Sequence, residues 1–404
     1  TAYEISLGLV GSEMCIRDRI YAVHPSEVEF CGCETYRNIS DLPSSIDAAF
    51  IGVNRISTVD IVSQLSKVNC GGAVCFASGY SEAVVELKDG HELQRALIDA
   101  AGRMPILGPN CYGIINYFDS FCLWPDQHGG QRVDSGVAII TQSSNIMINL
   151  TMQKRGLPIG YAVTAGNQAQ LGLAELATNI VKDTRVTALG LYVEGLGSIR
   201  NFEKLVSLCD ELGKAIVVIK IGKSEHAQLS AVSHTASLAG NDKGASALMK
   251  RLGVARVNSL SEFIETLKVF HCHGRLSGSS VASVSCSGGE ASLIADICNG
   301  SQLVFPKLTK EQTNGLNSAL GAKVALANPL DYHTYIWGDA SKMAQTFISI
   351  MQDKNIDIGI IIVDFPRSDF CDPDAWSCVV EAAVITKKAI KKPIALMSTL
   401  AENI

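Results

Sequence analysis

The sequence lacks long apolar runs and has no excess of basic residues. None of its apolar runs reaches the roughly 18 residues that a membrane-spanning helix needs, so we expect no membrane association. Its 34 Lys and Arg are outnumbered by 40 Asp and Glu, which gives a net charge of −6. Nucleic-acid backbones are bound by clustered basic side chains, and here these are scattered, so we expect no nucleic-acid partner.

Charged residues are also few, at 18%, whereas apolar residues make up 47%, which excludes a largely disordered chain. A length of 404 residues predicts two to four domains. The 13 cysteines lie mostly in apolar runs of a long chain, which favours a reduced, cytoplasmic setting over an extracellular disulfide scaffold. His271 and His273 flank Cys272 without a second Cys/His pair at zinc spacing, so the sequence predicts no metal site.

Residues 1–19 differ in character from the rest of the chain. Their apolar part is too short, and too close to acidic residues, for a targeting peptide. The run SLGLVGSEMCIRDR instead resembles translated sequencing-adaptor read-through. We therefore expect residues 1–19 to be non-native and the native sequence to begin near Ile20.

From Ile20 onward, β-branched runs alternate with amphipathic segments, a pattern typical of parallel βαβ units. Polar links at 128–136 and 274–280 divide this alternating pattern into three blocks. We therefore expect three domains, at 20–130, 131–276 and 277–404. The second and third each open with a β-run, a Ser-rich turn and a helix, which predicts two related doubly wound domains. The strands expected in the first domain are IYAVHP, AAFIGVN, GGAVCFAS and PILGPN, with helices near 57–68 and 89–102.

Two turns have the composition of anion sites. Ser143, Ser144 and Asn145 follow the buried run VAIIT and begin a helix, where free backbone N–H groups and the positive helix end attract anions. SCSGGEASL (285–293) repeats this pattern with two glycines that let an anion approach the backbone. The alternative for both turns is an ordinary helix N-cap.

One histidine and one acid complete the candidate chemistry. His234 lies among small residues in LSAVSHTASLAG (229–240), which suits an accessible nucleophile, although a loop histidine also serves structure alone. Glu194 ends the run VTALGLYVE, and the carboxyl ends of parallel strands bind ligands. A carboxylate there could orient an imidazole, or it could simply be a capping or solvated acid.

Six segments occur together in a characteristic order and spacing: LGPNCYGIIN (107–116), TQSSN (141–145), LYVEGLGSIRNF (191–202), SAVSHTASLAG (230–240), SCSGGEASL (285–293) and NPLDY (328–332). In this order and spacing they resemble the NDP-forming acyl-CoA synthetases, which are relatives of the succinyl-CoA synthetase α subunit. The resemblance covers residues 20–404 and implies an α/β chain. A Rossmann-like CoA-binding domain, truncated by loss of its first strand and Gly-rich loop, would precede two flavodoxin-like doubly wound domains, and the ATP-grasp domain would be absent.

The resemblance assigns roles to residues. His234 would be the phosphorylated residue and Glu194 its acidic partner. Ser144 stands where the family often has glycine, and Cys111 would serve packing. The phosphate-binding residues implied are Ser143, Ser144, Asn145, Gly166, Ser287, Gly288 and Gly289. The coenzyme A residues implied are Val53, Asn54, Arg55, Ser78, Gly79, Asn110 and Gly113.

The implied activity is ADP-forming ligation of a small carboxylic acid to coenzyme A. ATP, ADP and Mg would bind through an ATP-grasp domain or β subunit, in a homo- or hetero-oligomer. Two alternatives stay open: a CoA-binding regulatory module of a protein acetyltransferase, and a ligase or lyase for zwitterionic acids of the dimethylsulfoniopropionate type. A nicotinamide dehydrogenase is a weaker rival because no GxGxxG follows a strand.

The segment NPLDYHTYIWGD (328–339) is dense in rings for a chain with 6% aromatics. Asp331, Tyr332, Tyr335 and Trp337 are therefore candidate substrate residues. Ring faces there could attract a cationic acid by cation–π contact. The alternative is that these rings pack beneath the loop or at a subunit interface.

Overall fold

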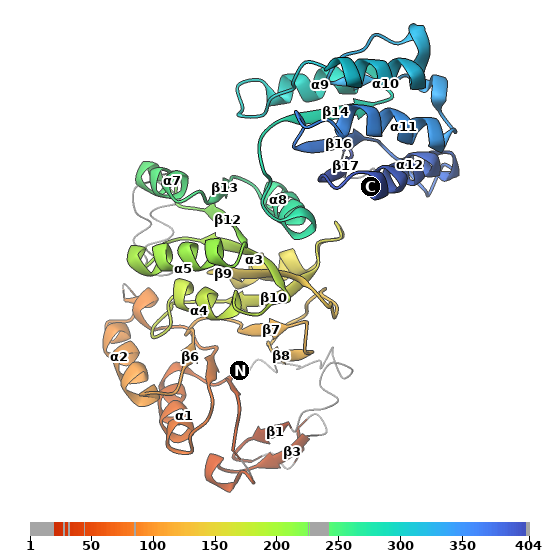
Figure 1. Ribbon diagram of the computed structural model, residues 1–404. Helices are drawn as coiled ribbons and strands as arrows, with labels where there is room; N and C mark the ends of the chain where they lie inside the picture. Colours follow the sequence, from red (N-terminus) through yellow and green to blue (C-terminus); the bar gives the residue numbers. More distant parts are fainter. Residues whose placement is uncertain are drawn as a thin grey trace. The chain divides into compact units, whose positions relative to one another are not determined.

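The computed structural model divides into two compact units, Thr1–Gly274 and Arg275–Ile404, which we describe separately (Figure 1). The break between them falls at one end of the polar link 274–280. Within the part of the chain that the structure describes, no helix is both long enough and apolar enough to cross a membrane. The described residues are 20–26, 29–30, 33–43, 45–84, 86–224, 226 and 242–400.

The first unit begins with two small sheets. In one, β4 (Ala49–Ile51), β5 (Ala73–Cys75) and β6 (Ile106–Leu107) run parallel, with α1 (Arg55–Lys67) and α2 (Gly90–Ala101) between them in sequence. These elements confirm the predicted alternation. Apolar side chains of both helices and all three strands form one buried cluster, which includes Val62, Leu65, Leu97, Cys75 and Ile106.

The other small sheet has a pairing that the sequence did not predict. The run IYAVHP does form a strand, β1 (Tyr21–Val23), but β1 pairs in parallel with β3 (Cys33–Tyr36) and not with β4. β2 (Glu29–Phe30) pairs antiparallel with β3. The alternation of apolar runs predicts that a strand exists, whereas its partner depends on contacts that the pattern does not contain.

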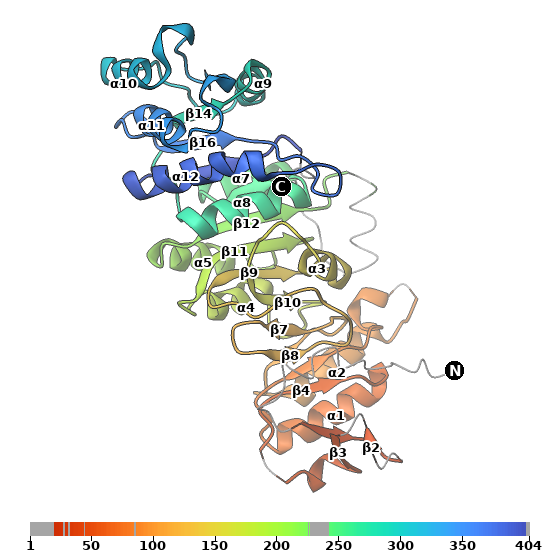
Figure 2. The same cartoon turned by 90° about the vertical axis from the view of Figure 1, so that its right-hand side faces the viewer.

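The main sheet of this unit has seven strands in the order β13-β12-β11-β9-β10-β7-β8 (Figure 2). The five strands β9 to β13 run parallel, in the 2-1-3-4-5 order of flavodoxin-like folds. β7 and β8 form an antiparallel hairpin added to β10, so the sheet already begins upstream of the polar link 128–136. The strands are β7 (Ile114–Asn116), β8 (Phe121–Leu123), β9 (Gly136–Thr141), β10 (Ile159–Thr164), β11 (Val186–Val193), β12 (Ala215–Lys220) and β13 (Ala255–Val257).

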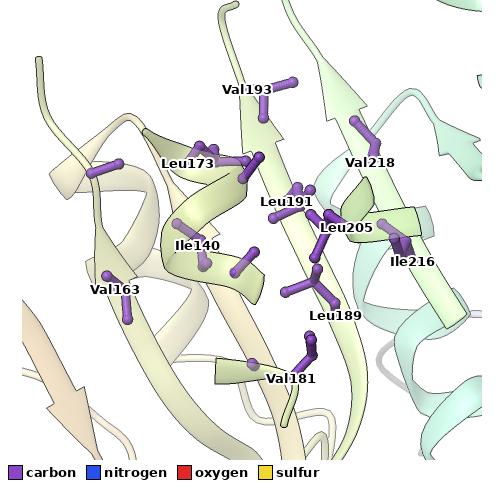
Figure 3. Packing of buried hydrophobic residues seen from close by; sticks show 14 of the residues in the cluster. Ile140, Val163, Leu173, Val181, Leu189, Leu191, Val193, Leu205, Ile216 and Val218 are labelled. Carbon is purple, nitrogen blue, oxygen red and sulfur yellow. The ribbon is translucent and has the colours of Figure 1, made fainter. Parts of the chain in front are cut away.

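Both faces of this sheet are covered, because alternate residues of its buried strands point to opposite sides. Ala138 and Ile140 of β9 face a cluster shared with α4 and α5. Figure 3 shows Ile140 in this cluster with Leu173 of α4 and Leu205 of α5. Val137 and Ile139 face a second cluster shared with α3 and α8. The helices of this region are α3 (Ser144–Thr151), α4 (Leu173–Ile180), α5 (Ile199–Glu211), α7 (Asp242–Arg251) and α8 (Leu260–His273).

The second unit repeats the same plan with a four-stranded parallel sheet, ordered β15-β14-β16-β17. Ala282 and Val284 of β14 pack against a cluster drawn from α10, α11 and α12, while α9 contacts β14 and β15. The predicted α/β class with doubly wound parallel sheets is therefore confirmed. The elements are β14 (Val281–Ser285), α9 (Gly288–Cys298), α10 (Lys310–Leu320), β15 (Leu330–Asp331), α11 (Ala340–Met351), β16 (Ile358–Ile362), α12 (Ser377–Ala389) and β17 (Ile394–Met397).

Candidate functional site

The carboxyl edge of the seven-stranded sheet gathers several of the predicted residues. Ser143 follows β9, Gly166 follows β10 and Glu194 follows β11, and these three strands are adjacent and parallel. The crossover from β9 leads to β10 on one side of it, and the next crossover leads from β10 to β11 on the other side. The crevice between β9 and β11 is therefore the switch point where such sheets bind ligands. His234 lies outside the described residues, in the stretch of chain between β12 and α7.

The turn after β9 is built as a helix N-terminus. Ser143 is the N-cap of α3, and its hydroxyl accepts a hydrogen bond from the backbone N–H of Ile146 at 3.4 Å. Asn145 is exposed in the first turn. The Ser144 hydroxyl accepts a hydrogen bond from the backbone N–H of Tyr112 at 3.3 Å. The Ser144 side chain therefore binds the neighbouring loop.

Gly166 is explained by close packing of the backbone. Its φ is +54°, and a Cβ added to it would lie 2.2 Å from the carbonyl oxygen of Pro109. Next to it, the hydroxyl of Thr164 accepts hydrogen bonds from the backbone N–H groups of Tyr112 (3.0 Å) and Gly113 (2.8 Å). The LGPNCYG loop thus lies directly against the end of β10.

Glu194 is held by a residue that the sequence reasoning missed. It is buried, with 9% of its surface exposed. The side-chain oxygen of Gln142, also buried, accepts hydrogen bonds from the backbone N–H groups of Glu194 (2.5 Å) and Gly195 (3.1 Å). The available sequence signals were the place of Gln142 within the segment TQSSN (141–145) and its position between a buried strand and the N-cap of α3.

A second missed residue is Lys220, the last residue of β12. It is only 2% exposed, and its ammonium donates a hydrogen bond to the carbonyl oxygen of Ile221 at 2.5 Å. Burial lowers its pKa, while the charges of Asp242 and Glu194 act in the opposite direction. Lys220 pairs in register with Val193, directly before Glu194. A lysine interrupting the apolar run AIVVIKIG was the available signal.

Three of the predicted coenzyme A residues line one cleft of about 560 Å³. One lining residue is Glu82, whose carboxylate accepts hydrogen bonds from the backbone N–H groups of Gly79 (2.6 Å) and Tyr80 (3.1 Å). Asn167, which follows β10, also donates to this carboxylate, so the cleft is joined to the sheet edge. The lining residues are Ser78, Gly79, Glu82, Ala83, Glu86, Leu87 and Asn110.

The other predicted coenzyme A residues have visible structural duties. The Asn54 side chain caps α1 by accepting from the backbone N–H groups of Ile56 and Ser57, and Val53 beside it is 39% exposed. Arg55 forms an ion pair with Asp89 at 2.8 Å and donates to the carbonyl oxygen of Gly79, on the wall of the cleft.

Two residues of the LGPNCYG loop serve packing. Gly113 has φ +122°, and a Cβ there would lie 2.2 Å from the carbonyl oxygen of Leu123. Cys111 is 1% exposed, and burial raises the pKa of its thiol. Cys111 is part of a buried apolar cluster, in agreement with the expected packing role.

The second unit has a similar turn at the switch point of its own sheet. Ser287 is the N-cap of α9, and Gly288 and Gly289 open that helix. A Cβ on Gly288 would lie 3.1 Å from the carboxylate of Asp331, so acids border this turn. Burial, together with the charges of Asp364 and Asp331, raises the pKa of Glu290 in the first turn of α9.

The predicted aromatic residues of this unit make three separate ring contacts. Tyr332 is fully buried and its ring centroid lies 5.6 Å from that of Phe347. Trp337 packs edge-to-face on Trp376 at 5.7 Å. Tyr335 is 67% exposed, and its ring lies 5.4 Å from that of His333.

Two family descriptions match the chain in order. "CoA binding domain" matches residues 9–117, and "Succinyl-CoA ligase like flavodoxin domain" matches residues 134–270. The first match begins within residues 1–19, whose origin stays a prediction. The division at residue 130 likewise stays a prediction.

Characterised relatives agree with these descriptions. The trans-feruloyl-CoA synthase FCS1 of an unknown prokaryotic organism is 29% identical over 87% of this chain and 50% of its own length. The ADP-forming acetate–CoA ligase I of Archaeoglobus fulgidus is 28% identical over 85% of this chain and 49% of its own. The α subunit of the ADP-forming acetate–CoA ligase II of Pyrococcus furiosus is 28% identical, over 86% of this chain and 75% of that subunit.

The chain thus spans about half the length of the first two relatives. The solved structure of the dinucleotide-forming acetyl-coenzyme A synthetase 1 of Ca. Korarchaeum cryptofilum has the same fold, with a TM-score of 0.82. At 21% identity, the match covers 97% of this chain and 83% of that one. The two matched domains, their order along the chain and these relatives support the family of NDP-forming acyl-CoA synthetases that the sequence resembles.

Proposed function

We propose that this chain is the CoA-binding and phosphohistidine part of an ADP-forming acid–CoA ligase. One feature of the arrangement supports this proposal most strongly, namely the position of the candidate groups at one edge of the seven-stranded sheet. The Ser143 turn, the Glu194 carboxylate and the start of the segment that contains His234 all follow parallel strands at one edge of the sheet. Phosphoryl transfer through a histidine needs an imidazole, an acidic partner for it and a site that holds the phosphoryl group, such as a helix N-terminus.

In the proposed reaction, phosphate attacks the thioester of an acyl-CoA and the thiolate leaves, giving an acyl phosphate. A ring nitrogen of His234 then attacks the phosphorus, the P–O bond to the acyl group breaks, and the carboxylate leaves. Phosphohistidine finally passes its phosphoryl group to ADP. Every step is reversible, so the opposite direction forms acyl-CoA from acid, CoA and ATP. Glu194 would orient the imidazole and stabilise its cationic form.

Backbone N–H groups at the start of α3 would stabilise the phosphoryl oxygens, with Ser143, Ser144, Asn145 and Gly166 shaping the turn. The corresponding turn of the second unit, Ser287 to Gly289, would provide an equivalent anion site. Coenzyme A would lie in the cleft that Ser78, Gly79 and Asn110 line, next to Val53, Asn54, Arg55 and Gly113.

The substrate would be a small carboxylic acid. The relatives are named for acetate, 4-hydroxybutyrate and trans-ferulate, so acids from this range are the first to test. Asp331, Tyr332, Tyr335 and Trp337 are the proposed substrate residues. Of these, Tyr335 is the ring most open to solvent. The relatives favour neither the regulatory module nor the zwitterionic-acid enzyme that the sequence left open.

ATP, ADP and Mg would be bound by an ATP-grasp domain, either in the same polypeptide or in a β subunit, as part of a homo- or hetero-oligomer. Some relatives are named as α subunits, which supports an ATP-grasp domain in a separate β subunit.

The test is product analysis with this chain joined to an ATP-grasp domain, fused or as a separate subunit. ATP, CoA and a panel of acids should give acyl-CoA, ADP and phosphate, with ADP formation dependent on both acid and CoA. Formation of AMP and pyrophosphate would contradict the proposal.

A further inference from the structure

We infer that Gln142 is a positioning residue that sets the direction of the Glu194 carboxylate and couples it to the phosphate-binding turn. This inference rests on the proposed function, in which Glu194 pairs with His234. Gln142 lies in the segment TQSSN (141–145), but the family resemblance assigned it no role.

The first step is the position of Gln142 at the switch point of the sheet. It follows β9 directly, and the next residue, Ser143, is the N-cap of α3. Its own backbone N–H donates to the carbonyl oxygen of Tyr192 at 3.1 Å, so its main chain is joined to β11. Gln142 therefore bridges the two strands whose ends form the crevice.

The second step is the pair of hydrogen bonds that its side chain makes. A single amide oxygen, with two lone pairs, accepts from the N–H groups of Glu194 (2.5 Å) and Gly195 (3.1 Å). All three residues are buried, so water does not replace these bonds easily. Two bonds to consecutive peptide groups fix the plane of the chain after β11, and with it the Cα–Cβ direction of Glu194.

The third step concerns the charges around Glu194. Lys220 of β12 and Tyr192 of β11 are titratable groups that interact with its carboxylate. A neutral acceptor at position 142 orients Glu194 without adding a second negative charge beside it. Glutamine meets this need, whereas glutamate would keep the geometry and change the electrostatics.

The experiment follows phosphorylation of the chain by acetyl [³²P]phosphate as a function of pH. Gln142→Leu removes the acceptor and should lower the labelling rate by about 100-fold, as a misplaced catalytic group does. Gln142→Glu keeps an acceptor oxygen, so it should restore much of the rate at high pH. Its added negative charge lies beside the Glu194 carboxylate, so the acid limb of the pH profile should move to higher pH.

The matched control is Gln153→Leu. Gln153 also makes two hydrogen bonds with the backbone, to Leu157 and Arg155, but beyond the other end of α3. This variant should keep the wild-type rate and profile. Equal rate losses in Gln142→Leu and Gln153→Leu, or a Gln142→Glu profile unchanged from wild type, would overturn the inference.

A second measurement separates this inference from the proposed function. Hydrogen exchange of the peptide that contains Glu194 and Gly195 should become faster in Gln142→Leu and stay slow in Gln142→Glu. Unchanged exchange in Gln142→Leu overturns the positioning role whatever the labelling result. Absence of label from the wild-type chain, with the predicted exchange pattern, counts against the proposed function alone.

Discussion

The side-chain amide of Asn167 donates a hydrogen bond to the buried carboxylate of Glu82, which joins the end of β10 to the wall of the cleft. The same carboxylate accepts the backbone N–H groups of Gly79 and Tyr80. Both peptide groups are buried, so the Glu82 carboxylate accepts the hydrogen bonds that water would accept at an exposed site. One side chain thus holds together the proposed coenzyme A cleft and the proposed phosphoryl edge.

Replacing Glu82 should therefore be costly. Glu82→Ala leaves two buried N–H groups without an acceptor, and we expect the free energy of unfolding to fall by about 3 kcal/mol. Glu82→Gln keeps an acceptor and should lose about 1 kcal/mol. Urea unfolding of the chain measures both. The control is Glu86→Ala, at an exposed acid of the same cleft, which should stay within about 0.5 kcal/mol of wild type.

Gly113 should not tolerate a side chain. Its φ of +122° and the 2.2 Å approach of a Cβ to the Leu123 carbonyl oxygen predict that Gly113→Ala lowers the free energy of unfolding by about 3 kcal/mol or more. Gly156 also has a positive φ, +73°, but has open space around it. Gly156→Ala should cost only about 1 kcal/mol. Equal losses in the two variants would show that contact with Leu123 is unimportant.

The Asp183 carboxylate should make the free energy of unfolding depend on pH in the acid range. The guanidinium of Arg185, 2.8 Å away, lowers the pKa of Asp183 to about 2. Its pKa is lower in the folded state than in the unfolded chain. Its contribution is therefore complete above the unfolded value of about 4 and is lost as the pH falls through about 2. Because Arg185 is partly exposed, we expect the ion pair to contribute about 1 kcal/mol to the free energy of unfolding.

Comparing wild type with Asp183→Asn between pH 5 and pH 2 measures this contribution. The difference in the free energy of unfolding should be present at pH 5 and should vanish near pH 2. A difference that is constant over this range would mean that the ion pair is not its source.

Glu194→Gln should leave folding intact and slow phosphorylation. The substitution preserves shape but removes the anion that orients the imidazole and stabilises its charge, so we expect the rate to fall on the order of 100-fold. Circular dichroism and thermal unfolding check the fold, and labelling by acetyl [³²P]phosphate gives the rate. Labelling at the wild-type rate would refute the role of Glu194.

The sequence predicted the helices and strands of the fold better than it predicted which strands pair with each other. Apolar runs and amphipathic segments predicted β4, β5 and β6 and the helices α1 and α2, because such patterns mark single elements along the chain. These patterns did not predict that β7 and β8 would join β10, or that β1 would pair with β3, since pairing depends on register and tertiary contacts.

The same limit applies to the site. Ser143 and Glu194 are candidates from their places at strand ends. The side chain of Gln142, by contrast, bonds to the chain that follows another strand, and Lys220 lies near Glu194 only because of strand register. Tyr332 stands among other rings in the sequence, yet it points into the core, because Asp331 and Tyr332 are neighbours that point to opposite sides. Ring density in a sequence does not show which rings share a face.

The central claim is that His234 carries the phosphoryl group. The direct test is incubation of the wild-type chain and of His234→Ala with acetyl [³²P]phosphate, followed by acid or alkali treatment. The account predicts label in the wild type alone, lost in acid and stable in alkali, as expected of a phosphoramidate, and located on His234 by mass spectrometry. Label that persists in His234→Ala, or that survives acid, would contradict it.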